Sequence, residues 1–175
     1  MIEKMVFAAG ASESSMEVIR CMKSMRKLGI KKCLLLQCYS PGEEASAIGG
    51  IVGEIYEENL ARQKELLEEQ GYEVETRIVK GSLENEVNDI AEKENADIIV
   101  TKATNRSLIG DAVFKGLAYE VLHKSEKPVM LVRANFKADA DIECDIMNHI
   151  MFPTDFSENA AKAFGALKSL APCHG

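Results

Sequence analysis

The chain has 175 residues, of which 46% are hydrophobic and 28% are charged, as expected for one globular domain with a short remainder. Its net charge of −7 argues against nonspecific binding to nucleic acid or to an anionic membrane. The sequence shows neither a membrane-spanning apolar run nor a signal-peptide layout, and its five cysteines contain no Cys-x-x-Cys pair, so we expect a cytoplasmic protein with reduced thiols.

Predicted strands and helices alternate from the first residues onward. Short apolar runs predict five strands, at residues 4–9, 32–39, 72–79, 97–101 and 127–132. Alternation with short connections is typical of an α/β fold, a doubly wound parallel five-stranded sheet with helices on both faces. The third run alternates polar and apolar residues, which suits an edge strand, whereas the first, second and fourth are continuously apolar. This predicts the strand order 3-2-1-4-5.

Helical spacing and end signals mark the segments between the strands. Ser14 and Glu17 fit a capping box for a helix that ends at Gly29, and Gly71 ends a long helix over residues 50–70. The expected buried side of the long helix is Ile51, Ile55, Leu60, Leu66 and Leu67. A later helical pattern places on one side Val113, Gly116, Leu117, Val121 and Leu122.

The polar loop that follows the fourth strand is the expected location of a binding site. In a parallel sheet, backbone N–H groups and a helix N-terminus converge at this position and favour anions. Lys102 and Arg106 are natural anion partners, and Asn105 and Ser107 can add hydrogen bonds; the alternative is an ordinary solvated loop. Cys38, near the end of the second strand, is a further candidate, although a cysteine in an apolar strand usually packs as a small hydrophobe.

The sequence offers little support for catalysis or for a metal. It has no Gly-x-Ser-x-Gly elbow and no Walker A motif, and no nucleophile stands beside a base. The three histidines are scattered, so we expect no zinc site.

The start of the chain recurs near its end. Residues 4–14 match residues 149–159 at a constant offset of 145 positions, with Phe7 matching Phe152 and Ser12 matching Ser157. A repeat spaced by one domain length indicates tandem duplication. We therefore expect a first domain at 1–133, a linker at 134–148, and at 149–175 the incomplete start of a second domain, with its first strand and helix.

Several of these segments resemble the universal stress protein family. Residues 151–157, Met-Phe-Pro-Thr-Asp-Phe-Ser, are similar to the opening strand and turn of that family. Residues 97–100, Gly116 and residues 127–132 are similar to its last two strands and the helix between them. The resemblance implies an adenine nucleotide alpha hydrolase-like fold and a role in stress response.

The resemblance also implies a degenerate nucleotide site. Nucleotide-binding members carry an aspartate after the first strand and a Gly-x2-Gly-x9-Gly-Ser/Thr loop after the fourth. The residues at these positions are Gly10 for the aspartate, Lys102, Asn105 and Gly116 for the three glycines, and Leu117 for the hydroxyl residue. Of the pattern only Gly116 is kept. Asp155 matches the aspartate in the second copy, where the alternative is a turn residue that starts a helix. ATP or AMP is the candidate ligand, and no cofactor is certain.

Three functions are compatible with this sequence. The leading one is a non-enzymatic stress-response module that acts through dimerisation and contacts with an unknown protein partner. The second is an ATP or AMP sensor that uses the loop 102–117. The third, a hydrolase or ligase, is disfavoured because the Ser-Gly-Gly-x-Asp-Ser loop of such enzymes is replaced by Ala-Gly-Ala-Ser at residues 9–12. We expect a homodimer through the edge strand Val129–Val132, with the segment 149–170 docked on the dimer or exchanged between subunits.

Overall fold

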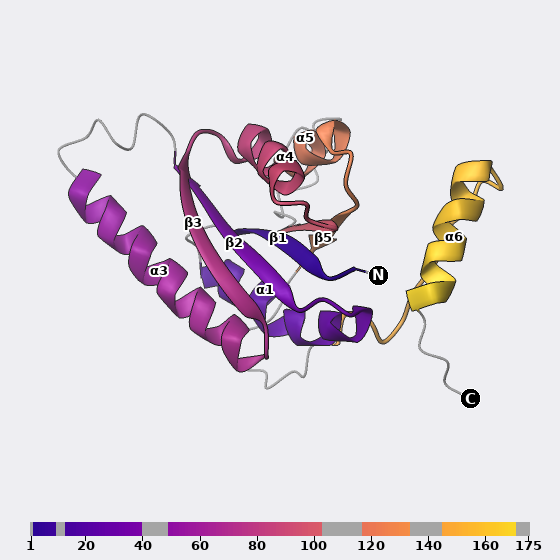
Figure 1. Cartoon of the computed structure of the whole chain (residues 1–175), viewed down its shortest axis with the longest axis horizontal. Helices are drawn as coiled ribbons and strands as arrows, with labels where there is room; N and C mark the ends of the chain where they lie inside the picture. The colour runs from indigo at the N-terminus through magenta and orange to yellow at the C-terminus, as the bar shows by residue number, and fades with distance from the viewer. Residues whose placement is uncertain (1, 10–12, 40–48, 103–116, 134–144, 171–175) are drawn as a thin grey trace, which may run out of the picture.

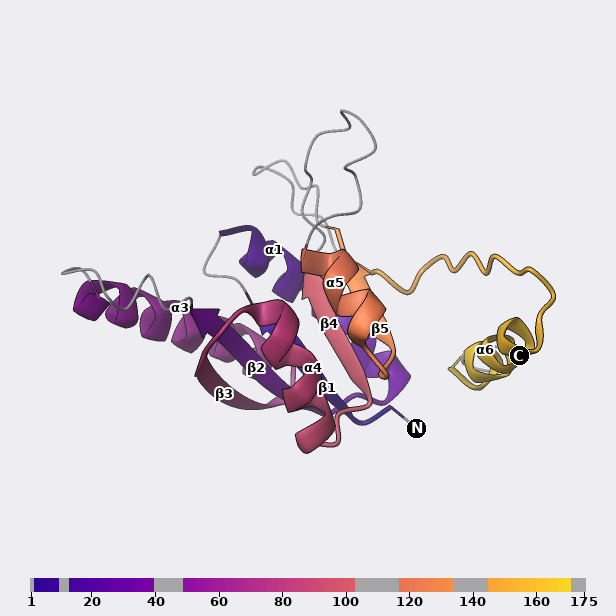
Figure 2. The ribbon, with the colours of Figure 1, turned by 90° about the horizontal axis from the view of Figure 1, so that it is seen from above.

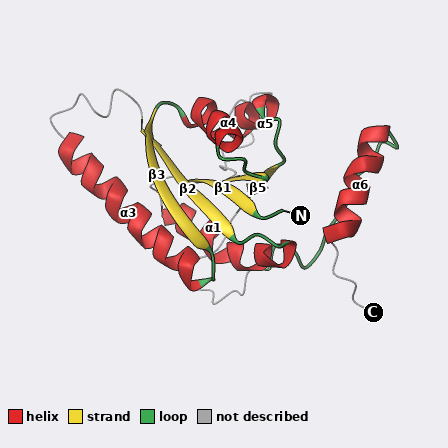
Figure 3. Ribbon diagram, viewed as in Figure 1, coloured by secondary structure: helices red, strands yellow, loops and turns green. Residues whose placement is uncertain are grey.

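A parallel sheet covered by helices on both faces forms the body of the molecule (Figures 1 and 3). The computed structural model describes residues 2–9, 13–39, 49–102, 117–133 and 145–170. Its strands are β1 (Lys4–Ala9), β2 (Lys32–Tyr39), β3 (Glu73–Lys80), β4 (Ile98–Lys102) and β5 (Val129–Val132). Its helices are α1 (Glu13–Cys21), the 3-10 helix η1 (Met22–Leu28), α3 (Gly49–Glu69), α4 (Leu83–Lys93), α5 (Leu117–Lys124) and α6 (Glu158–Leu170).

The strand order confirms the sequence prediction. The strands lie in the order β3-β2-β1-β4-β5, and every neighbouring pair is parallel. Met5 and Phe7 of the central strand β1 have no exposed surface, whereas most of the alternating strand β3 lies exposed at an edge. The continuous or alternating hydrophobicity of each strand thus reports its place in the sheet.

Two hydrophobic clusters, one on each face, hold the helices to the sheet. On one face α1, η1 and α3 pack over side chains that include Phe7, Leu35 and Val100. On the other face α4 and α5 pack over Val6, Leu34 and Ile99. Figure 2 shows α4 and α5 together on one side of the strands. Successive residues of a strand point to opposite faces, so each buried strand contributes to both clusters.

The first helix departs from its prediction at its start and in the form of its second half. It begins at Glu13, so Ser14 lies inside the helix and cannot be its N-cap. At Met22 the α-helix changes to the tighter 3-10 form, which continues to Leu28. Its predicted end is confirmed, because Gly29 takes a left-handed φ of 95° that glycine adopts without strain.

Contacts of Tyr72, Arg26 and Gly71 hold η1 against the start of β3. The Tyr72 hydroxyl donates a 2.6 Å hydrogen bond to the carbonyl of Met22. The Arg26 guanidinium lies 5.6 Å from the centre of the Tyr72 ring. Gly71, at φ 90°, ends α3 as predicted, and a Cβ at that position would lie 2.9 Å from the Arg26 guanidinium.

Ile55, predicted to be buried, is exposed, and so is Leu122, predicted to share a helical side with Val121. Ile55 is 47% exposed, although Leu60 and Leu67 on the same helix are buried. The amino-terminal half of α3 diverges from β3 in Figure 1, so its apolar residues gain less cover from the sheet. Leu122 is 44% exposed beside the fully buried Val121, because consecutive helical residues point about 100° apart.

The chain after residue 144 first docks on this body and then leaves it. Lys27 pairs with Asp145 at 2.6 Å, and Ile146 and Met147 pack against the cluster under α1 and η1. Residues 149–157 form no strand, which corrects the expected first strand of a second copy, since a strand requires a neighbour for its backbone hydrogen bonds. Helix α6 follows and lies apart from the sheet in both views (Figures 1 and 2).

Candidate functional site

The carboxyl ends of β1, β2 and β4 form the edge at which the sequence predicts a site. Ala9 lies level with Gln37 of β2, and Ala8 lies level with Thr101 of β4. Gln37 and Thr101 are buried polar residues at the ends of otherwise apolar strands. Small residues on the central strand and polar residues on its neighbours give this edge the character of a ligand-binding edge in a doubly wound sheet.

Lys102 and Cys38 are the candidate strand residues that the structure describes, and they lie on different faces. Cys38 is half-buried, is not in a disulfide, and packs against the cluster under α4 and α5. Lys102 is also half-buried. It lies two residues after Val100 and so on the same face of the sheet, and Val100 belongs to the cluster under α1, η1 and α3. The structure therefore does not bring these two side chains together in one pocket.

Of the candidates around the loop, Leu117 is placed as the first residue of α5. The others, Gly10, Asn105, Arg106, Ser107 and Gly116, lie outside the described residues.

Gln37 is the residue at this edge that the sequence interpretation missed. Its side chain is 6% exposed, and its amide nitrogen donates a 3.0 Å hydrogen bond to the carbonyl of Cys38. By strand alternation Gln37 lies on the same face as Lys102. The detectable signal was a polar residue directly after the apolar run of residues 33–36.

Asp155 acts as a turn residue before α6. One carboxylate oxygen accepts the N–H of Ser157 at 2.9 Å, and the Ser157 hydroxyl accepts the N–H of Ala160 at 3.1 Å as the helix cap. The hydrogen bonds from the Ser157 side chain and backbone lower the pKa of Asp155. Asp155 is exposed and precedes a helix that lies away from the sheet, so the structure does not place it at the strand ends (Figure 2).

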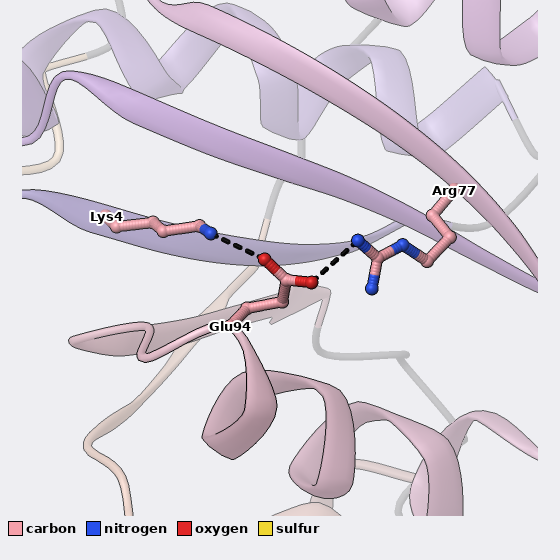
Figure 4. Close-up of polar contacts among 3 residues, drawn as sticks. All are labelled: Lys4, Arg77 and Glu94. Atoms are coloured by element: carbon pink, nitrogen blue, oxygen red, sulfur yellow. Dashed lines mark hydrogen bonds and ion pairs between the residues drawn. The ribbon is translucent and has the colours of Figure 1, made fainter.

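A cluster of three charged side chains lies elsewhere, where α4 ends. Glu94 stands between two cations in Figure 4: Lys4 of β1 at 2.8 Å and Arg77 of β3 at 2.7 Å. The hydrogen bonds from Lys4 and Arg77 lower the pKa of the Glu94 carboxyl. Because both carboxylate oxygens are engaged, this cluster holds the end of α4 to the sheet and offers no poised general base.

Asp97 forms a second polar anchor, between the starts of β1 and β4. One carboxylate oxygen accepts the backbone N–H groups of Glu3 at 2.8 Å and Lys4 at 2.9 Å. Partial burial raises the pKa of Asp97, but these hydrogen bonds and the nearby positive charges outweigh it, so the net shift is downward. The sequence interpretation had treated this residue only as the start of a strand.

The described cysteines give no sign of a reactive thiol. Burial raises the pKa of Cys33 to about 12, which keeps the thiol protonated. Cys21 is disulfide-bonded, which departs from the expectation that all thiols are reduced. Among the described residues, no group of three His, Cys, Asp or Glu side chains is arranged to hold a metal ion. The same part of the chain contains no helix that is both long and apolar enough to cross a membrane.

The strand order and the helices on both faces define a protein of the doubly wound α/β class. Residues 1–133 match the model of the universal stress protein family, and the chain belongs to that family.

Curated relatives and solved structures agree with this assignment. Universal stress protein MJ0577 of Methanocaldococcus jannaschii is 24% identical over 155 residues, covering 76% of this chain and 96% of the relative. MJ0531 of the same organism is 29% identical over 86 residues, covering 49% of this chain and only 51% of that relative.

The structural matches show the same fold at low identity. The structure of MJ0577 superposes with a TM-score of 0.66 at 24% identity, covering 78% of this chain and 99% of that one. The superposition on a universal stress protein from Archaeoglobus fulgidus DSM 4304 has a TM-score of 0.71 at 20% identity. It covers 98% of this chain and 63% of that chain. The superposition on a second universal stress protein from Archaeoglobus fulgidus, in complex with dAMP, has a TM-score of 0.54 at 22% identity. It covers 75% of this chain and 98% of that chain.

Proposed function

We propose that this protein is a non-enzymatic stress-response module that acts in the cytoplasm through dimerisation and contacts with a protein partner. In this proposal its nucleotide site is degenerate and does not bind ATP or AMP tightly. The acidic composition supports a location away from membranes and nucleic acid.

The observation that carries this proposal is Lys102 at the end of β4. The nucleotide-binding pattern of the family has a glycine at this position, where the backbone must approach phosphate oxygens closely. Lysine places a Cβ and a long half-buried side chain there instead. Leu117, the first residue of α5, likewise replaces a hydroxyl that would donate to phosphate.

Thermal unfolding with ATP, ADP and AMP, with and without magnesium, tests the degenerate site. A ligand present at one hundred times its dissociation constant stabilises a protein by about 2.7 kcal/mol, which gives a clear shift. We expect no such shift at submillimolar nucleotide for the natural chain. The double variant Gly10→Asp and Leu117→Ser should gain a shift, whereas a large shift for the natural chain would contradict the proposal.

Dimerisation is proposed to occur through β5. Among the described strands β5 pairs only with β4, so its other edge carries backbone groups without a strand partner. Leu131 on this strand is 37% exposed. Light scattering at tens of micromolar should report a dimer, and a monomer would refute this part of the proposal.

We also propose that residues 149–170 belong to a second copy of the domain. The repeat at an offset of 145 supports this, as does the match to a longer Archaeoglobus fulgidus protein along 98% of this chain. The counterpart of Met151 in β1 is Val6, which has no exposed surface, yet Met151 is 91% exposed. Removing residues 135–175 should lower the melting temperature or the dimer fraction if the segment docks on a dimer; unchanged values would refute docking.

The second candidate function is an adenine-nucleotide sensor that uses the loop 102–117. It is favoured by the complexes of related universal stress proteins with dAMP and with cAMP, and by a lysine at the end of β4. A side-chain cation can attract phosphate where glycines are missing. The same thermal unfolding assay decides between the two functions, because Lys102→Ala should abolish any shift that a sensor shows.

A further inference from the structure

One edge of the sheet, along β3, offers backbone groups to an incoming strand. The N–H of Glu73 donates to the carbonyl of Lys31 at 2.8 Å, so this residue faces β2. In a parallel ladder alternate residues face the same neighbour. Thr76 and Ile78 therefore turn their N–H and C=O groups away from β2, toward a side where the described chain places no strand.

A groove lies beside this edge, between α3 and β3. Its volume is about 400 Å³, and it is lined by Glu57, Leu60, Ala61, Lys64, Thr76 and Ile78. The groove opens because α3 diverges from β3 toward its amino end (Figure 1). Val74 under the helix is only 9% exposed, whereas Ile78 further along the strand is 37% exposed. Thr76 and Ile78, which have outward backbone groups, thus also line a groove whose apolar residues are Leu60, Ala61 and Ile78.

Carboxylates and cations both lie around this edge, with Lys32 of β2 level with Glu73 and Lys80 at the end of β3. Two nearby cations are already paired, Arg77 with Glu94 and Lys64 with Glu68. Within the described part of the chain no ion pair involves Glu57, Glu73 or Glu75. Glu73 and Glu75 are exposed on the face of β3 opposite the groove. An added strand would therefore meet the groove with Leu60, Ala61 and Ile78 on one face, and Glu73 and Glu75 on the other.

We propose that β3 and the groove bind an extended segment of a partner protein in which apolar and basic residues alternate. The segment adds to the sheet beside β3 through the outward groups of Thr76 and Ile78, a known mode of peptide recognition. Its apolar side chains enter the groove near Leu60 and Ile78. Its basic side chains lie beside Glu73 and Glu75, since directly opposed residues on neighbouring strands have Cβ atoms about 5 Å apart.

This surface would supply the partner contact of the proposed function, on which the inference rests for its biological role. It lies at the opposite edge of the sheet from β5 and away from the carboxyl ends of the central strands. The dimer and nucleotide assays do not involve β3. The two proposals can therefore fail separately.

Fluorescence anisotropy with the full chain and a labelled peptide tests the binding. The probe is an eight-residue peptide of alternating valine and lysine, matched to the eight residues of β3. The control peptide has the same composition with the valines in one block and the lysines in another, so its charge is identical but its pattern is wrong. We expect the alternating peptide to bind at least about tenfold more tightly. Equal affinity, or no binding at millimolar peptide, would overturn the proposal.

A matched pair of variants locates the binding edge. Ile78 on β3 and Leu131 on β5 are each 37% exposed, on opposite edges of the sheet. Ile78→Lys should weaken the affinity for the alternating peptide by about tenfold, and Leu131→Lys should change that affinity by less than about twofold. The conservative variant Glu75→Gln should weaken binding and flatten its salt dependence. Equal effects of the two lysine variants, or unchanged binding and salt dependence in Glu75→Gln, would show that the peptide does not bind here.

Discussion

Replacing Asp97 by asparagine should test how strongly the starts of β1 and β4 are joined. The Asp97 carboxylate accepts two backbone N–H groups, at 2.8 and 2.9 Å. A hydrogen bond to a charged group contributes about 1.5–3 kcal/mol when sheltered from water. This site is only partly buried and asparagine keeps one acceptor, so we expect a loss of about 1–2 kcal/mol for Asp97→Asn.

The effect of this substitution should depend on pH in a defined direction. The pKa of Asp97 is lower in the folded chain than in the unfolded chain, so its stabilising contribution is complete above the unfolded value of about 3.9. It is lost as the pH falls through the lower folded value. The difference between the natural chain and Asp97→Asn should therefore be largest near neutral pH and should shrink in acid.

Urea unfolding at a series of pH values measures both quantities. The matched control is Asp89→Asn, the same change at an exposed position of α4. If Asp97→Asn costs no more than the control, or if its cost stays constant into acid, the two hydrogen bonds do not stabilise the fold as reasoned here.

Three further predictions concern neighbouring features. Tyr72→Phe removes the donor to the Met22 carbonyl without loss of packing volume, and should cost about 1–2 kcal/mol in chemical unfolding, against no comparable cost for Tyr39→Phe. Gly71→Ala should destabilise by about 1 kcal/mol because of its positive φ and the close Arg26 side chain, whereas Gly53→Ala, in the open part of α3, should stabilise by about 0.5–1 kcal/mol. The same sign for both glycine variants would contradict the backbone argument. Glu94→Gln should weaken the acid dependence of unfolding, because the lowered pKa of Glu94 stabilises the fold only while the carboxyl is ionised; an unchanged pH profile would refute this.

The sheet was predictable from sequence because burial on two faces leaves a direct signal. Met5, Leu35 and Ile99 lie in continuous apolar runs, and each is fully buried in a strand with neighbours on both sides. The exposure of Ile55 was not predictable in this way. Helical periodicity shows which side of a helix is apolar, but it does not show how far the helix extends past the sheet that covers it.

The site was less predictable because its polar contacts join residues far apart in sequence. Asp97 accepts hydrogen bonds from residues more than ninety positions away. A local pattern shows an aspartate before a strand and nothing more. The opposite faces taken by Cys38 and Lys102 likewise follow from register and alternation in the folded sheet.

The docking of Asp145, Ile146 and Met147 fixes where the following chain begins. Through the pair with Lys27 and the apolar contacts, this short turn acts as a tether point on the body. A segment that starts from a fixed point meets nearby surfaces at an effective concentration in the millimolar range, far above that of a free molecule. Contacts too weak to form between separate molecules can therefore be populated by whatever follows residue 147.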